Sequence, residues 1–191
     1  MIHESAYIEN AKIGYGTKIW HFVHVRDGAK IGKNCNIGKG VYIDTNVEIG
    51  DDCKIQNFAS IFQGVTIKNN VLIGPHVCFT NDLYPRASFW GEERIEKTLV
   101  QDGASIGANA TIVAGINIGK YAIIGAGAVV TNDVPDYGLF YGNPARLKGF
   151  VCECGQKLYR MDIDKNEVIL QCKICKKIIK IDENIYKEID K

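Results

Sequence analysis

Apolar residues recur at every sixth position over the first part of the chain, from Ile13 to Phe79. A small or branched residue stands two positions before each of them, as Cys35 does before Ile37. No helix has this period, whereas alternate residues of a strand share a face, so both positions point inward. Asn, Asp or Gly usually comes one residue earlier still, and these residues tolerate the left-handed backbone of a tight corner. The pattern therefore predicts short strands joined by corners and stacked into a solenoid.

The repeat stops after Phe79 and resumes at Val100, 21 residues later. Since 21 is not a multiple of six, we expect about fifteen residues to leave the solenoid as a loop within 80–99. The period then continues to Val130. A β-sandwich with accidental periodicity is the alternative, but so many six-residue repeats with a small residue at the matching position disfavour it.

Composition restricts the function classes. The 191 residues include 46% hydrophobic residues, enough for a core, and carry 23 Lys and Arg against 22 Asp and Glu. A net charge of +1 gives no electrostatic footprint for nucleic acid or an anionic membrane. The start of the chain lacks the basic and apolar regions of a signal peptide, and no apolar run reaches the roughly twenty residues of a membrane span. The sequence predicts a cytoplasmic protein, in which scattered cysteines such as Cys35, Cys53 and Cys78 stay reduced.

Three stretches carry a family resemblance: "IGKNCNIGKGVYI", "IGANATIVAGINIGKYAIIGAGAVVT" and "YGNPARLKGF". They resemble the hexapeptide-repeat acyltransferases, whose all-β fold is a left-handed parallel β-helix with three hexads per coil. The likeness covers 1–149. Together with "FTNDLYPRA" and "NDVPDYGLFYGNPAR", it is most similar to the N-acetyltransferases of nucleotide-linked 3-amino sugars, the UDP-2-acetamido-3-amino-2,3-dideoxy-glucuronate type. The resemblance implies transfer of an acetyl group from acetyl-CoA to a sugar amine, expected at C3, for surface polysaccharide biosynthesis.

One predicted corner is unusual because it carries aromatic rings. With three hexads per coil, Phe22, Gly40, Phe58 and His76 fall in one column, whereas the other corner columns hold Asn, Asp and Gly. A corner facing water does not need aromatic side chains, so something is expected to cover it. The cover is either the chain's own loop or tail, or a second subunit. The resemblance implies a homotrimer with an active site in each groove between neighbours.

Candidate residues for the sugar side lie near this corner and in the interrupting loop. Acyl transfer needs an oriented amine and a place for its proton. The residue that matches Asn81 sits beside the amine in the resembling enzymes, and His76 and His24 are the candidate bases, with His76 taken as the catalytic one. The alternatives are a turn residue for Asn81 and a groove-lining residue for His76. Side chains that could bind the sugar or its diphosphate complete the set: His24, Arg26, Tyr42 and Arg86.

Small residues in "IGANA" and "IGAGA" leave the backbone approachable, as a pantetheine arm requires. The resemblance implies that Ala108 and Ala126 offer amides to acetyl-CoA, with Pro144 and Arg146 of "GNPAR" near the adenosine phosphates. No glycine-rich phosphate loop before a helix is present, so ATP or NAD is not expected.

The repeat is absent from the tail, 150–191. Cys152-x-Cys154 and Cys172-x-x-Cys175 resemble a zinc ribbon with a β-hairpin between the pairs. Four thiolates leave no open coordination site, so a bound zinc is expected to stabilise rather than catalyse; empty thiols or disulfides are the alternatives.

Two other functions fit the same solenoid. A γ-type carbonic anhydrase holds zinc by three histidines between subunits, but this chain has four histidines and His21-x-x-His24 is their only close pair in sequence. A trimeric scaffold whose ribbon binds a partner would not cleave a thioester when an amino sugar is added.

Overall fold

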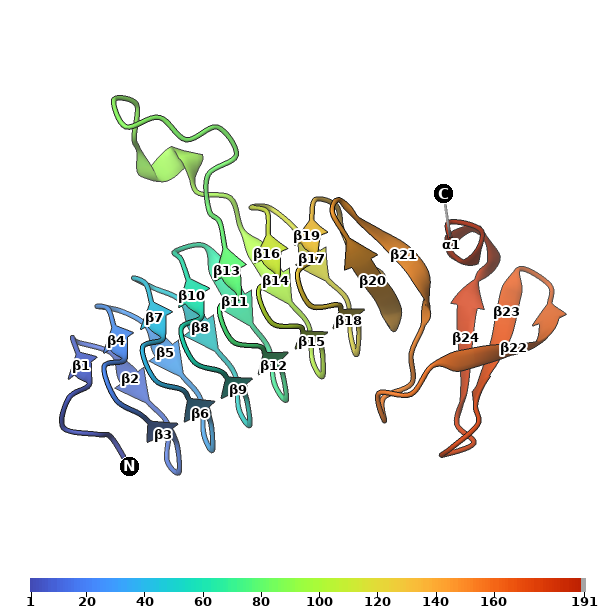
Figure 1. Cartoon of the computed structure of the whole chain (residues 1–191), viewed down its shortest axis with the longest axis horizontal. Coiled ribbons are helices and arrows are strands. Elements are labelled where there is room, and N and C mark those ends of the chain that lie inside the picture. Colours follow the sequence, from blue (N-terminus) through green and yellow to red (C-terminus); the bar gives the residue numbers. More distant parts are fainter. Residues whose placement is uncertain (190–191) are drawn as a thin grey trace.

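The structure is a computed structural model that describes residues 1–189. Short strands follow one another around a triangular prism, so that three parallel sheets run along its length (Figure 1). Each face is named here by one of its outward residues. The His24 face contains β1 (Tyr7–Ile8), β4 (His24–Val25), β7 (Tyr42–Ile43), β10 (Ser60–Ile61), β13 (Cys78–Phe79), β16 (Thr111–Ile112) and β19 (Val129–Val130).

Two further faces complete the prism. The Lys30 face contains β2 (Lys12–Ile13), β5 (Lys30–Ile31), β8 (Glu48–Ile49), β11 (Val65–Ile67), β14 (Thr98–Val100) and β17 (Asn117–Ile118). The Lys54 face contains β3 (Lys18–Ile19), β6 (Asn36–Ile37), β9 (Lys54–Ile55), β12 (Leu72–Ile73), β15 (Ser105–Ile106), β18 (Ile123–Ile124), β20 (Gly138–Gly142) and the antiparallel β21 (Ala145–Phe150).

The strand register confirms the predicted solenoid. Ile13 stands opposite Ile31, and Ile31 stands opposite Ile49, so one coil takes three hexads. The two apolar residues of each hexad are buried inside the prism, as shown by Ala59 and Ile61 at 0% exposure. A fully buried isoleucine of this kind contributes about 1.5–3 kcal/mol relative to an exposed one. The stacked aliphatic columns therefore supply the stability of the fold.

The interruption has the predicted size. Val100 pairs with Ile67 across β14 and β11, and this step exceeds one coil by fifteen residues. The extra residues project from the corner between the His24 and Lys30 faces (Figure 1). They carry one turn of 3-10 helix (Glu92–Arg94), and the tip side chains of Tyr84, Phe89 and Trp90 are 78%, 70% and 61% exposed. The loop thus stands away from its own prism and does not lie over it.

Beyond β21 the chain forms a second, smaller sheet. Its antiparallel order is β22 (Leu158–Asp164), β23 (Glu167–Cys172) and β24 (Ile178–Asp182), followed by the short helix α1 (Glu183–Tyr186). This sheet lies at the C-terminal end of the prism (Figure 1). It joins the same buried cluster through residues such as Cys152, Leu170 and Ile179.

Candidate active site

The aromatic corner, formed by Phe22, Gly40, Phe58 and His76, joins the Lys54 face to the His24 face. Phe22, Phe58 and His76 adopt left-handed backbone conformations, with φ of 57°, 60° and 58°. Such a conformation costs a residue with a side chain roughly 1–2 kcal/mol. The other corners share this conformation and fill it mostly with Asn, Asp or Gly, so the three rings occupy positions that smaller residues adopt more easily.

The rings of this corner form a ladder. The His76 ring stacks on Phe58 with centroids 5.2 Å apart. The Lys39 ammonium lies 5.8 Å from the centroid of Phe22 and 5.9 Å from that of Phe58. His76 is exposed, and within the described chain no hydrogen bond to its ring is found. The imidazole nitrogens are therefore available to a ligand.

The same corner continues past His76 with small residues. Pro75 accepts a hydrogen bond from the backbone N–H of Asn109, and Ala108 accepts one from Gly127, so each coil stacks on the last. Within 1–189, the N–H groups of Ala108 and Ala126 have no hydrogen-bond acceptor. A Cβ on Gly107 would lie 2.5 Å from the Ala126 nitrogen, so glycine is needed for this close stacking. Two free amides thus follow His76 in line.

The β20–β21 hairpin extends this line to the end of the prism. Phe140 in β20 stands opposite Ile124 and accepts a hydrogen bond from Gly125, which places the hairpin turn next to Ala126. Pro144 and Arg146 are exposed at that turn. With strands about 4.8 Å apart, the corner from His76 to this turn spans three steps, or roughly 15 Å. The structure therefore aligns His76, Ala108, Ala126 and the hairpin along one edge.

Asn81 lies on the other side of the His24 face, at the base of the loop. Its backbone carbonyl accepts a hydrogen bond of 2.9 Å from Glu96 and so closes the loop base. Asp82 and Arg94 add a two-point ion pair, with Nε to Oδ2 at 2.8 Å, and this hydrogen bonding lowers the pKa of Asp82. The side-chain amide of Asn81 has no partner among the described residues. It lines a hollow of about 470 Å³ together with Pro85, Arg86 and Trp90.

Asn81 and His76 are thus on opposite sides of strand β13. Asn81 is five positions after His76, so their Cα atoms can be up to about 17 Å apart. Cys78 lies between them on the same strand, with a half-buried side chain. Burial raises the pKa of the Cys78 thiol, so the neutral thiol is favoured and a covalent thiolate route through Cys78 is disfavoured.

Near the start of the His24 face, three sequence candidates meet. The His24 and Tyr42 rings lie 5.6 Å apart, and Arg26 donates to Asp44 at 3.3 Å. The sequence predictions did not include Glu9 and Asp44. Glu9 lies 2.8 Å from His24 Nε2, and that hydrogen bond is the main cause of its lowered pKa. A hydrogen bond that Arg26 donates to Tyr42 is likewise the main cause of the raised pKa of Arg26.

Asp44 is the centre of this polar network. Its Oδ1 accepts hydrogen bonds from Arg26 and from the Tyr42 hydroxyl at 3.0 Å. Backbone N–H groups complete the set: that of Thr45 donates to Oδ1 at 2.8 Å, and that of Gln63 donates to Oδ2 at 3.2 Å. Tyr42 lies two coils from the Cys78 row and His24 lies three coils from it, or about 10 and 14 Å. Asp44 follows Arg26 by one full coil of eighteen residues, and this spacing could have revealed the pair from the sequence. Arg86 is not part of the network, because Arg86 is exposed on the loop and donates to the Pro85 carbonyl.

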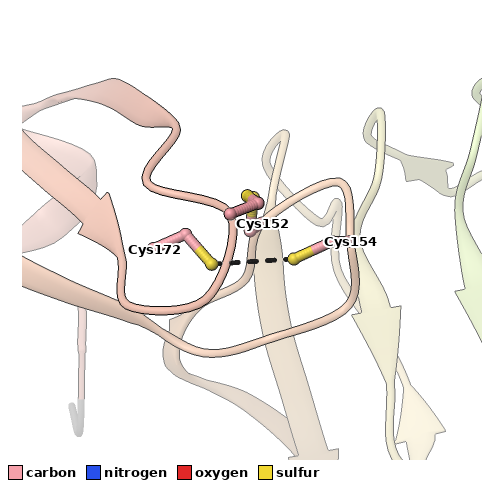
Figure 2. Close-up of side chains that lie close together, drawn as sticks. Cys152, Cys154 and Cys172 are labelled. Atoms are coloured by element: carbon pink, nitrogen blue, oxygen red, sulfur yellow. Dashed lines mark hydrogen bonds between the residues drawn. The ribbon is translucent and has the colours of Figure 1, made fainter.

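The four tail cysteines come together as predicted. Their sulfur atoms all lie within 4.8 Å of one another, so they can hold one metal ion. Figure 2 shows three of them, Cys152, Cys154 and Cys172. They are the only group of His, Cys, Asp or Glu side chains found with this capacity in residues 1–189. The histidines are dispersed: the rings of His3 and His21 are in tilted contact with centroids 3.6 Å apart, and His24 pairs with Glu9. The three-histidine set of the carbonic anhydrase alternative is not assembled within the described chain. Among residues 1–189, no helix is long and apolar enough to cross a membrane.

A β-helix with free amides and an exposed histidine along one corner defines a hexapeptide-repeat protein of the acyl-transferring class. The family described as bacterial transferase hexapeptide (six repeats) matches 10–45, 28–63, 46–81 and 97–132. The chain belongs to this family.

Several proteins of named activity are similar to this chain. Over 171 residues, 90% of this chain and 87% of the relative, it is 56% identical to dTDP-3-amino-3,6-dideoxy-α-D-galactopyranose 3-N-acetyltransferase of Aneurinibacillus thermoaerophilus. A mutant perosamine N-acetyltransferase of Caulobacter crescentus, solved with CoA and GDP-perosamine, is 26% identical with a TM-score of 0.50. That match covers 78% of this chain but 55% of the other. The polysialic acid-specific acetyltransferase NeuO, 20% identical with a TM-score of 0.55 over 84% and 85% of the two chains, shares the fold.

Proposed function

We propose that this protein is an acetyl-CoA-dependent N-acetyltransferase that acetylates the C3 amine of a nucleotide-linked amino sugar. The observation that carries the proposal is the corner on which exposed His76 is followed by the free amides of Ala108 and Ala126 and by the hairpin turn. The 3-N-acetyltransferase that is 56% identical to this chain supports the amine as acceptor.

The line of groups fits an extended thioester. The amides of Ala108 and Ala126 donate to the amide carbonyls of the pantetheine arm, and Arg146 is placed to pair with phosphates at the far end. The acetyl carbonyl then lies toward His76. Positioning of this kind supplies much of the catalysis in acyl transfer, because it holds the carbonyl in reach of the attacking amine.

The reaction needs one proton transfer. The neutral sugar amine attacks the acetyl carbonyl, the tetrahedral intermediate expels CoA as a thiolate, and the amine nitrogen loses a proton. We assign the acceptance of that proton to His76, directly or through water. We assign to Asn81 the role of accepting an amine N–H on its side-chain oxygen, which aims the nitrogen lone pair at the carbonyl. The partnerless amide of Asn81 and the exposed ring of His76 support these roles.

The proposed assembly is a homotrimer with the site between subunits. In one chain the His24 face is open, Asn81 and His76 lie on opposite sides of it, and the aromatic side chains of the loop tip are exposed. A second copy packed against this face would turn it into a groove and cover both the aromatic corner and the loop tip. The network of Arg26, Tyr42 and His24 then lies in the groove, where it would bind the nucleotide sugar.

A substrate panel tests the proposal. Purified protein is mixed with acetyl-CoA and a set of dTDP- and UDP-linked 3-amino sugars, and the released CoA thiol is measured. We expect thiol release only with amine-bearing sugars. The matched control is the same nucleotide sugar with a hydroxyl in place of the amine. Thiol release that is equal with both compounds would contradict N-acetylation.

A further inference from the structure

The tail brings four thiols together from two separate turns. Cys152 and Cys154 lie in the turn that follows β21, and Cys172 and Cys175 lie at the turn between β23 and β24. The close sulfur pairs link one turn to the other. Cys152 and Cys175 are 3.4 Å apart, and Cys154 and Cys172 are 3.6 Å apart (Figure 2 shows the second pair).

These distances fit one ion surrounded by four sulfurs. A zinc ion with Zn–S bonds of about 2.3 Å at the centre of a tetrahedron separates its sulfurs by roughly 3.8 Å. The two close contacts lie slightly below this value, and the upper limit of 4.8 Å for the cluster lies above it. A disulfide requires about 2.05 Å. The arrangement therefore suits a shared metal better than two disulfides.

The backbone of both turns is shaped to present the thiols. Gly155 and Lys176 adopt left-handed conformations, with φ of 82° and 64°. The amide of Gly155 donates to the Cys152 carbonyl at 2.8 Å, and the amide of Lys176 donates to the Cys172 carbonyl at 3.0 Å. A lysine in this conformation is strained. Each turn is thus closed by a backbone hydrogen bond to the carbonyl of its first cysteine, over three residues in the first turn and four in the second.

The tail sheet has only a small core of its own beside its contacts with the prism. Its sheet buries few large side chains, chiefly Leu158, Val168, Leu170, Ile179 and Ile181. A segment of about 40 residues seldom folds on a core of this size without disulfides, a metal or a partner surface. The matched hexapeptide repeats end at 132, so the cysteines lie outside the repeats that define the family.

The cysteine turns also contact the end of the prism. Val151 donates to the Tyr137 carbonyl at 2.8 Å. The Tyr137 hydroxyl donates to Glu153 at 3.3 Å, and Glu153 pairs with Lys177 at 2.6 Å. Because Glu153 and Lys177 belong to different turns, an ion that joins the turns would hold both against the last coil.

We propose that Cys152, Cys154, Cys172 and Cys175 bind one Zn²⁺ as four thiolates, and that this ion fastens the small sheet to the end of the β-helix. Binding releases up to four thiol protons. Four protein ligands fill the tetrahedron, so the ion has no open position for water or substrate. By fastening the small sheet, the ion keeps the end of the solenoid covered from solvent.

Metal analysis of the full-length chain tests the site. Protein purified in reducing buffer without chelator is expected to contain one zinc per chain by elemental analysis. Cys154→Ser and Cys175→Ser change exposed ligands and should lose most of the zinc. The matched control Cys53→Ala removes a buried thiol of the prism and should keep the full amount. Cobalt exchanged into the wild-type chain should show the thiolate charge-transfer band and the visible bands of a tetrahedral site.

A second measurement tests the role of the ion. Trypsin should cut at the tail lysines far faster after zinc removal, while the prism stays intact and acetyl transfer is retained. Cys175→His, which replaces one ligand by another, should keep zinc and protection. The site is refuted if the wild type holds iron or no metal, or if Cys53→Ala loses as much zinc as Cys175→Ser. The fastening role is refuted if zinc removal leaves tail cleavage unchanged.

Discussion

Replacement of Asn81 by alanine separates a positioning role from a structural one. The loop base is closed by the Asn81 backbone carbonyl and by the Asp82–Arg94 pair, and alanine keeps both. The side-chain amide has no partner among the described residues, so its removal leaves no donor or acceptor unsatisfied in the free protein. We therefore expect the same oligomer, the same thermal stability and the same CoA affinity as in the parent.

The effect should appear in catalysis. One orienting hydrogen bond to an amine that gains positive charge contributes about 1.5–3 kcal/mol. Since about 1.4 kcal/mol corresponds to a factor of ten in rate, kcat/KM for the sugar should fall roughly 10- to 100-fold. The assay follows released CoA thiol while the amino sugar is varied at saturating acetyl-CoA. Ser88→Ala, an exposed change in the same loop, is the control and should match the parent. An Asn81→Ala protein that equals the parent, together with an inactive His76→Ala, would show that Asn81 is only a turn residue.

Three further predictions concern the base, the polar network and the assembly. His76→Ala should lower kcat at least about 100-fold and abolish the acidic limb of the pH–rate profile; survival of that limb would assign it to the amine instead. The hydrogen bond with His24 is the main cause of the lowered pKa of Glu9. The ionised Glu9 therefore stabilises the fold above its ordinary pKa of 4.5. This stabilisation is lost as the pH falls through the pKa of Glu9 in the folded protein. The Tm gap between wild type and Glu9→Gln, measured by calorimetry, should therefore narrow below that pH, and a gap independent of pH would contradict the pairing. Light scattering at micromolar concentration should give the mass of three chains, whereas a monomer would remove the basis for an inter-subunit site.

Much of the fold could be read from the sequence because its period is set by local chemistry. The inward aliphatic columns, the corner columns and the fifteen-residue interruption all follow from counting hexads. The cysteine cluster was also predictable, because two closely spaced cysteine pairs joined by a hairpin are typical of a zinc ribbon. The free amides of Ala108 and Ala126 were expected from the family resemblance, whereas the small residues alone indicated only an approachable backbone.

Other parts required three-dimensional information. The Glu9 and Asp44 contacts depend on side-chain conformations across neighbouring coils, which a column count does not give. The chain's own loop was one of the covers considered for the aromatic corner, but the loop stands away from its own prism, and its base is closed by contacts such as that of Asp82 with Arg94.

The most direct test of the central claim is the position of the acetyl group in the product. The protein is incubated with acetyl-CoA and dTDP-3-amino-3,6-dideoxygalactose, the sugar nucleotide named for the 56% identical relative, and the product is analysed by nuclear magnetic resonance. The account predicts an amide at the C3 nitrogen, formed in equal amount with free CoA. An ester on a sugar hydroxyl, or an unmodified sugar after prolonged incubation with this and other 3-amino sugar nucleotides, would contradict it.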